Sequence, residues 1–145
     1  MKALIQRVLH ASVTVDEKIT GQIDQGLLVF LGVQKGDNKS NADFLSKKLC
    51  NLRIFEDENC KMNKSLLDIG GKMLVVSQFT LCADTSRGNR PGFDNAALPD
   101  EANALYEYFS DAVRSNGVEV QNGIFGADMR VEIVNDGPVT FMIEK

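Results

Sequence analysis

The chain has 145 residues, of which 43% are hydrophobic and 25% charged, and its formal net charge at pH 7 is -4. A chain of this length predicts a single domain, residues 1–145, with a sizeable core, because domains typically span about 100–200 residues. The acidic balance argues against a protein that grips a nucleic-acid backbone along its length, since such binding draws on many Lys and Arg side chains. An RNA partner would have to be contacted locally or at one end.

The sequence gives no sign of a membrane or of an oxidising compartment. The first twenty residues lack the apolar stretch of a signal peptide. The longest apolar run, residues 27–33, is far shorter than the roughly 20 residues needed to cross a bilayer. Three cysteines without C-x-x-C spacing indicate neither a disulfide framework nor a cysteine zinc site. We therefore expect a cytoplasmic protein with no membrane partner.

The first third of the chain predicts three strands and then a helix. Residues 4–15 are rich in β-forming side chains, and a short strand through residues 19–23 follows a polar turn. Gly26 opens a continuous apolar run that is typical of a buried central strand. Ser40, followed by Asp43, resembles a capping box. Together with leucines on one helical face it predicts a helix near residues 41–51.

The middle of the chain predicts a second apolar strand and a second helix. Residues 53–55 fit a short strand, and residues 72–81 form another apolar β run after a turn-rich segment. Residues 83–97 are polar and loop-like. Pro99 at a first helical position starts the second helix, which Gly117 ends.

The last part predicts two strands, residues 129–134 and 139–145, joined by a hairpin turn at Asn135-Asp136-Gly137-Pro138. The total is two helices and about seven strands. This pattern favours an α/β class, with layered mixed sheets covered by helices.

Few side chains offer catalytic chemistry. The phosphate-binding, dinucleotide-binding, zinc-protease and nucleophile-elbow motifs are all missing. His10 is the only histidine, and its place in a strand favours a surface or half-buried structural role. Metal sites built on imidazoles need two or three of them. We therefore expect neither a metal nor a cofactor.

Two segments place polar groups where a strand ends. Residues 77–81 (SQFTL) close an apolar strand, and their backbone amides either satisfy local structure or face a pocket and bind developing negative charge. Residues 135–140 (NDGPVT) include a proline that cannot donate to a sheet ladder. Arg87 and Arg90 are loop cations that either meet phosphates or remain solvated.

These two segments, in this order, resemble the signature motifs of the D-aminoacyl-tRNA deacylase family. The opening ALIQRVLHASVTV, the run GLLVFLGV, the stretch LVVSQFTLCADT and the pattern R-G-x-R-P also resemble it, so the likeness covers nearly the whole chain. The resemblance implies a compact α/β fold, a homodimer and hydrolysis of the ester between a D-amino acid and the 3′-terminal adenosine of tRNA. It also implies activity on glycine misloaded onto alanine tRNA, and no DNA partner.

The resemblance also implies roles for individual residues. Gly137 and Pro138 match a Gly-cisPro dipeptide that enters the active site of the partner subunit, and Arg7 matches an arginine that holds it. Further pocket positions are matched by Ser77, Gln78, Phe79, Thr80, Ala102, Phe125 and Met129. A rigid pair of carbonyls would exclude an L side chain by collision, and such a filter cannot reject glycine.

Catalysis in this family is held to draw on the ribose hydroxyl adjacent to the ester, which fits the shortage of catalytic side chains. We expect the backbone amides of Phe79 and Thr80 to stabilise the oxyanion. One alternative is a hydrolase of small D-amino acid esters or peptides with Ser77 or Thr80 as nucleophile. Another is a non-catalytic module that binds aminoacyl-tRNA ends.

Overall fold

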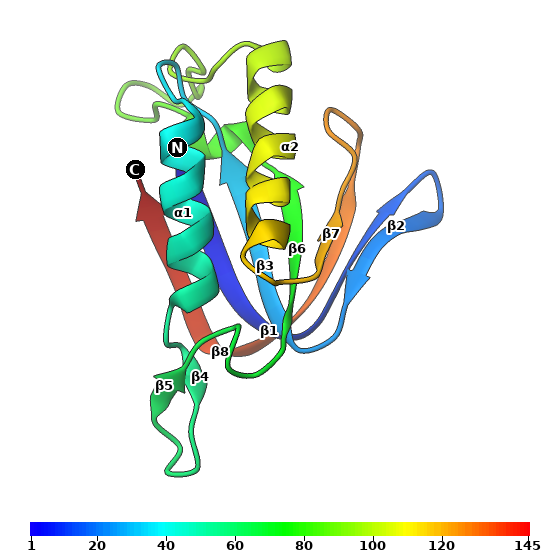
Figure 1. The fold of residues 1–145 in the computed structure, drawn as a ribbon. Coiled ribbons are helices and arrows are strands. Elements are labelled where there is room, and N and C mark those ends of the chain that lie inside the picture. Colours follow the sequence, from blue (N-terminus) through cyan, green and yellow to red (C-terminus); the bar gives the residue numbers. More distant parts are fainter.

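The first strand organises the sheet, as Figure 1 shows for a computed structural model that describes residues 1–145. β1 (Lys2–Val15) pairs antiparallel with β2 (Lys18–Ile23) and β3 (Gly26–Gly32) on one side. On its other side β1 pairs antiparallel with β8 (Arg130–Glu144). β8 has no other strand neighbour, so it forms an edge of the sheet.

The other half of the sheet is parallel and carries the helices. β3 pairs with β6 (Lys72–Ser77), and β6 pairs with β7 (Val120–Asn122). Parallel neighbours need long crossovers, which contain α1 (Lys39–Asn51) and α2 (Pro99–Ser115). Both helices lie side by side over one face of the sheet (Figure 1). The predicted α/β class with two main helices is confirmed, and neither helix is long and apolar enough to span a membrane.

The central strands are buried on both faces, which explains their continuous apolar runs. Val29 of β3 and Val75 of β6 point into the core beneath the helices. Leu28 and Leu74, their neighbours in sequence, point into a second, smaller core on the opposite face. Because β6 lies between these two cores, the residues that follow its last residue pass directly from the interior to the surface.

The structure corrects the predicted start of the first helix. α1 begins at Lys39, and its capping box joins Asn38 to Asn41, not Ser40 to Asp43. The Asn38 side chain accepts a hydrogen bond from the Ser40 backbone amide at 2.9 Å. Asparagine serves as an N-cap as well as serine does, so the composition of this loop left the cap position open.

Short strands were also misplaced. The strand expected at residues 53–55 is β4 (Phe55–Glu56), and it pairs with β5 (Met62–Lys64) inside the segment taken for a turn. β7 was missed, because only Val120 of its three residues is buried and no alternation marks it. The second helix does begin at Pro99, and Gly117 follows it at a positive φ of 91°.

The predicted hairpin turn at residues 135–138 is wrong. Both flanks belong to β8 and pair with the same strand, since Asn135 lies opposite Val8 and Thr140 lies opposite Gln6. Only Arg7 remains between these two partners. Residues 136–139 therefore form a wide bulge in one long strand, and the chain does not reverse there.

Candidate functional site

A cavity of about 530 Å³, called the β6 pocket below, opens where β6 reaches the surface. Its walls come from the end of β6 and the 3₁₀ helix η1 (Phe79–Cys82), from the start of α2, and from the loop between β7 and β8. Nine of its fourteen lining residues are hydrophobic. Its size and apolar walls are those of a site for a small organic group with a few polar contacts.

Six of the ten predicted site residues line this pocket, and four do not. The lining includes Ser77, Gln78, Phe79, Ala102, Phe125 and Met129. Thr80 directly follows Phe79 in the chain but is not part of the lining. Arg7, Gly137 and Pro138 are also absent from the pocket of their own chain.

The backbone at the end of β6 presents two unused donors. Gln78 is the last residue held to the sheet, since its amide donates to the Leu31 carbonyl at 2.9 Å. Phe79 and Thr80 are the first residues of η1, so the helix itself provides no acceptor for their amides. Neither amide donates a hydrogen bond outside η1. Two adjacent N–H groups are thus free to bind an anionic oxygen beside the pocket.

The Thr80 hydroxyl lacks a base. Its Oγ1 accepts a hydrogen bond from the Gln78 side-chain amide, and no carboxylate, lysine or histidine contacts it. Activating a hydroxyl nucleophile normally requires such a base within hydrogen-bond reach. The surroundings of Thr80 therefore favour a role for its backbone over one for its hydroxyl.

A buried polar network positions the far wall of the pocket. The Tyr106 hydroxyl donates to the Val75 carbonyl at 2.9 Å and accepts from Asn122 Nδ2 at 3.0 Å. Asn122 Nδ2 also donates to Ser110 Oγ at 2.8 Å. Burial raises the pKa of Tyr106, which keeps its proton for this network. The Tyr106 ring lies 6.0 Å from that of Phe125, so the network fixes the wall that Phe125 forms.

The sequence did not reveal this network. Tyr106 is buried on α2, and Asn122 lies in β7, the strand that the sequence did not predict. A polar residue opposite a buried tyrosine has no local sequence signal, because the two side chains come from different elements.

The bulge at residues 136–139 is firmly anchored. Arg7 is buried, and its Nε contacts the carbonyl oxygen and Oδ2 of Asp136, both at 3.0 Å. Its Nη1 donates to the Ile54 carbonyl at 2.7 Å. Asn135 Nδ2 donates to the Arg7 carbonyl at 2.9 Å, and Val139 is buried. The segment between these anchors has little freedom to move.

Gly137 and Pro138 project from this anchored frame. Both are exposed, and the peptide bond between them is cis. A Cβ atom at position 137 would lie 2.4 Å from Asn135 Oδ1 and 2.5 Å from the Val139 amide nitrogen, so only glycine fits. The dipeptide is a small, well-fixed edge of main chain presented to the outside.

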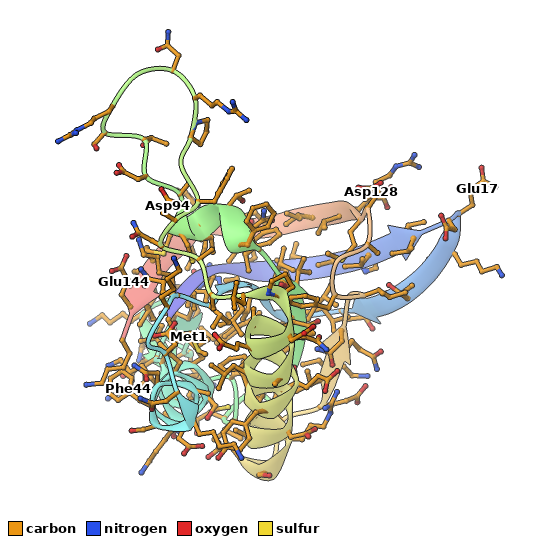
Figure 2. The ribbon with its side chains drawn as sticks, turned by 90° about the horizontal axis from the view of Figure 1, so that it is seen from above. Met1, Glu17, Phe44, Asp94, Asp128 and Glu144 are labelled. Carbon is orange, nitrogen blue, oxygen red and sulfur yellow. The ribbon has the colours of Figure 1, made fainter.

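A basic loop borders the pocket. Backbone hydrogen bonds between Asp84 and Gly92, at 2.8 and 2.9 Å, close the loop that carries Arg87 and Arg90. Figure 2 shows this loop, which precedes Asp94, projecting away from the body of the molecule. The rings of Phe93 and Phe79 lie 4.9 Å apart, which ties the loop to the pocket wall.

Elsewhere, no three His, Cys, Asp or Glu side chains lie close enough together to hold a metal ion. His10 is half-buried in β1, and its Nδ1 lies 3.8 Å from Asp24. This agrees with the structural role expected from the sequence.

Comparisons with known proteins point to one family. The family model described as D-Tyr-tRNA(Tyr) deacylase matches residues 4–144. The chain is 58% identical to a D-aminoacyl-tRNA deacylase of Geotalea daltonii, over 99% of this chain and 96% of that protein. It is 55% identical to the D-aminoacyl-tRNA deacylase of Pelobacter propionicus over the full length of both.

Solved structures give the same fold. One, titled c-Myc DNA Unwinding Element Binding Protein, has a TM-score of 0.94 and 40% identity, and the match covers 100% of this chain and 99% of that one. Another, titled as a probable eukaryotic D-amino acid tRNA deacylase, has a TM-score of 0.84 at 18% identity and supports the fold alone. It covers 99% of this chain and 98% of that one.

Proposed function

The chain belongs to the D-Tyr-tRNA(Tyr) deacylase family, and we propose that it removes D-amino acids and glycine, but not L-amino acids, from the 3′ end of tRNA. It is a hydrolase of ester bonds, a D-aminoacyl-tRNA deacylase, like its curated relatives. The observation that carries the proposal is the pair of free amides, those of Phe79 and Thr80, beside an apolar pocket. We place the reaction in the cytoplasm, where tRNA is charged.

These amides bind the carbonyl oxygen as it gains negative charge during attack on the ester. Removing one donor of this kind typically costs about 10²–10³ in rate. The pocket has no histidine or lysine in its wall to act as a base, and its one carboxylate, Asp128, is exposed. We propose that the ribose hydroxyl next to the ester assists the attack instead. Replacing the terminal adenosine by 2′-deoxyadenosine should therefore abolish most turnover, and full activity on that substrate would contradict RNA assistance.

Selection against L-amino acids is assigned to Gly137 and Pro138 of a second copy. A side chain and its mirror image offer the same attractive contacts, so a filter must work by exclusion. The anchored, exposed dipeptide suits such a wedge. What supports its action across two copies is that it does not line the pocket of its own chain. Glycine has no side chain to exclude, so it should pass.

The surface of β8 supports a homodimer. Most of this 15-residue strand is exposed although it carries large apolar side chains. Val134 is 50% and Met142 47% exposed, with Ile133 and Phe141 also uncovered. These side chains flank the bulge on both sides. An exposed apolar strand at a sheet edge is normally covered, and we propose that a second copy covers it.

A deacylation assay on D-tyrosyl-, L-tyrosyl- and glycyl-tRNA tests the function. The wild-type protein should cleave the D and glycyl esters and spare the L ester. Gly137→Ala should displace the wedge, because its Cβ has no room, and cleavage of the L ester should rise at least tenfold. Gly92→Ala is the matched control, since its Cβ would meet nothing closer than 3.9 Å. Equal cleavage of both enantiomers by the wild type would reject the filter.

A further inference from the structure

The basic loop, residues 84–92, carries two arginines that have no partner in the protein. Arg87 and Arg90 are both exposed, and neither takes part in an ion pair. The hydrogen bonds that arginine side chains donate within this chain all come from three other residues, namely Arg7, Arg53 and Arg114. The two guanidinium groups of the loop can therefore bind a ligand without breaking a contact of the fold.

The backbone of the basic loop keeps its own carboxylate away from these arginines. Asp84, at the base of the loop, accepts a hydrogen bond from the Ser86 backbone amide at 2.9 Å. Hydrogen bonding from Ser86 lowers the pKa of Asp84, so its charge stays at this position. Gly88 turns the tip of the loop at a positive φ of 65°. The positive charges lie on the tip, and Figure 2 shows that the tip projects from the body of the molecule.

The chain that follows the basic loop forms part of the wall of the β6 pocket. Ala96 and Ala97 line the pocket, and the ring of Phe93 lies 4.9 Å from that of Phe79, another lining residue. Arg90 precedes Phe93 by three residues, which span at most about 11 Å of chain. The arginines are therefore close to the mouth of the pocket.

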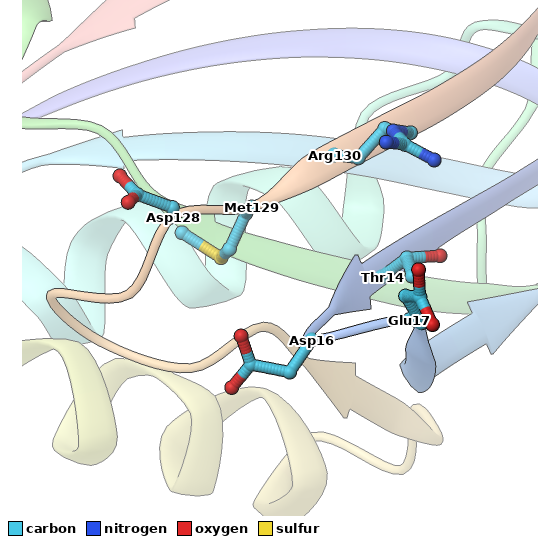
Figure 3. A pocket seen from close by; sticks show the side chains of 6 residues that line it. All are labelled: Thr14, Asp16, Glu17, Asp128, Met129 and Arg130. Atoms are coloured by element: carbon cyan, nitrogen blue, oxygen red, sulfur yellow. The ribbon is translucent and has the colours of Figure 1, made fainter.

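The rim formed by the loop between β7 and β8 carries the opposite charge. Asp128 lines both the β6 pocket and a neighbouring cavity of about 450 Å³. Asp16 and Glu17 also line this cavity, together with a single cation, Arg130. Figure 3 shows the Arg130 guanidinium directed away from Asp128, so it does not neutralise that carboxylate. A polyanion at the pocket is thus repelled by this rim and attracted by the basic loop.

We infer that Arg87 and Arg90 bind phosphates of the unpaired 3′ strand of tRNA where the strand leaves the β6 pocket, an inference that rests on the proposed function. A cavity of about 530 Å³ holds a small organic group, so the phosphates of the last nucleotides lie outside it. The planar guanidinium group matches phosphate oxygens with two parallel donors. Two local contacts also reconcile an RNA substrate with a net charge of -4, because no long basic surface is needed.

The test compares a substrate that has phosphates with one that has none. D-tyrosyl-tRNA carries the phosphate strand, whereas the D-tyrosyl ester of adenosine ends at the nucleoside. Each phosphate contact on a single strand adds about 0.7 to the steepness with which the logarithm of affinity falls with the logarithm of salt concentration. The double variant Arg87→Gln with Arg90→Gln should therefore reduce this slope, measured as kcat/KM for D-tyrosyl-tRNA, by about 1.4. Its KM for D-tyrosyl-tRNA at low salt should rise about tenfold, and its cleavage of the adenosine ester should match the wild type.

The matched control is Lys47→Gln with Lys48→Gln, which removes two exposed positive charges from α1, a helix that does not line the pocket. It should leave the slope and both substrates unaffected. An unchanged slope in the arginine variant would overturn the inference. So would an equal loss on both substrates, because the loop would then act on the pocket itself.

Sedimentation of the same variants separates an RNA contact from a protein contact. If the arginine variant self-associates more weakly than the wild type and keeps the wild-type salt slope, the loop binds a second copy of the chain and the inference is wrong. A wild type that cleaves neither D-tyrosyl substrate would instead contradict the proposed function, so the two failures are distinguishable.

Discussion

Arg7 links the sheet to the bulge at residues 136–139. It lies in β1, but its guanidinium bonds to Asp136 and to the carbonyl of Ile54, far away in sequence. Charges of this kind are costly to bury, and the cost is offset only while the partners stay in place. The Arg7 side chain is therefore one of the anchors that set the position of the dipeptide, beside Asn135 and Val139.

Replacing Arg7 tests this dependence. We expect Arg7→Gln to lower the free energy of unfolding by about 2–3 kcal/mol, because it leaves Asp136 and the Ile54 carbonyl without their donors. Cleavage of L-aminoacyl-tRNA should increase in the same variant. Urea denaturation and the deacylation assay measure the two effects. Arg53→Gln removes an exposed arginine with one hydrogen bond, to the Asn63 carbonyl, and should change neither quantity appreciably.

The three cysteines should differ in reactivity. Burial raises the pKa of Cys50 to about 11, and burial likewise raises the pKa of Cys82, whereas Cys60 is exposed. Because the thiolate is the reactive form, Cys50 should stay unreactive until the pH approaches that value. Alkylation of the native protein at pH 8 should modify Cys60 alone, and Cys60→Ser should show no fast phase. Rapid modification of two cysteines would contradict this burial pattern.

At the scale of elements, the β6 pocket depends on the parallel pairing of β3 with β6. The register begins at Gly26, opposite Lys72, where the two backbones approach closely. A Cβ at position 26 would lie 1.9 Å from the Lys72 carbonyl oxygen. Since a backbone atom cannot yield as a flexible side chain can, this pairing requires glycine.

We expect Gly26→Ala to lower the free energy of unfolding by about 3 kcal/mol and to shift Gln78 and Phe79 at the far end of β6. Chemical denaturation and the KM for D-tyrosyl-tRNA check the two consequences. Gly92→Ala again provides the comparison, since its Cβ has free space. If the variant were as stable as the wild type, β3 and β6 could separate at this position without a loss in the free energy of unfolding, which would contradict the requirement for glycine.

The sequence predicts elements that carry their own signals. The long strands, Pro99 at the start of α2 and the polar end of β6 are marked by apolar runs or by punctuating residues. The bulge at residues 136–139 was mistaken for a hairpin, because a turn-forming stretch between two β runs looks the same whether or not the chain reverses. Only the pairing of both flanks with β1 tells the two apart.

The site was also predictable only in part, because contacts between segments that are distant in sequence leave no local signal. Residues 77–80 are contiguous, and their location at a strand end made them candidates. The contact between Arg7 and Asp136, the Tyr106–Asn122 network and the place of Asp128 in the pocket all join distant segments. No periodicity or spacing encodes such contacts. Arg7 was singled out through family likeness alone, and Asp128 was not singled out at all.

At the scale of the whole molecule, we propose that the two halves of the machinery belong to different copies. The pocket lies at the end of β6, and the wedge lies on β8, which is exposed and apolar on both sides of the bulge. A dimer that buries this strand would cover its apolar side chains. We propose that the same contact brings the wedge of each copy to the pocket of the other.

Mixed dimers test this arrangement most directly. One chain carries Gly137→Ala, which displaces the wedge, and the other carries Ala127→Trp, which fills the pocket from its half-buried wall. If the wedge acts across the interface, the mixed dimer keeps one complete site and should cleave D-tyrosyl-tRNA while sparing L-tyrosyl-tRNA. A mixed dimer that cleaves both enantiomers at equal rates would contradict the account, because the wedge would then serve its own chain.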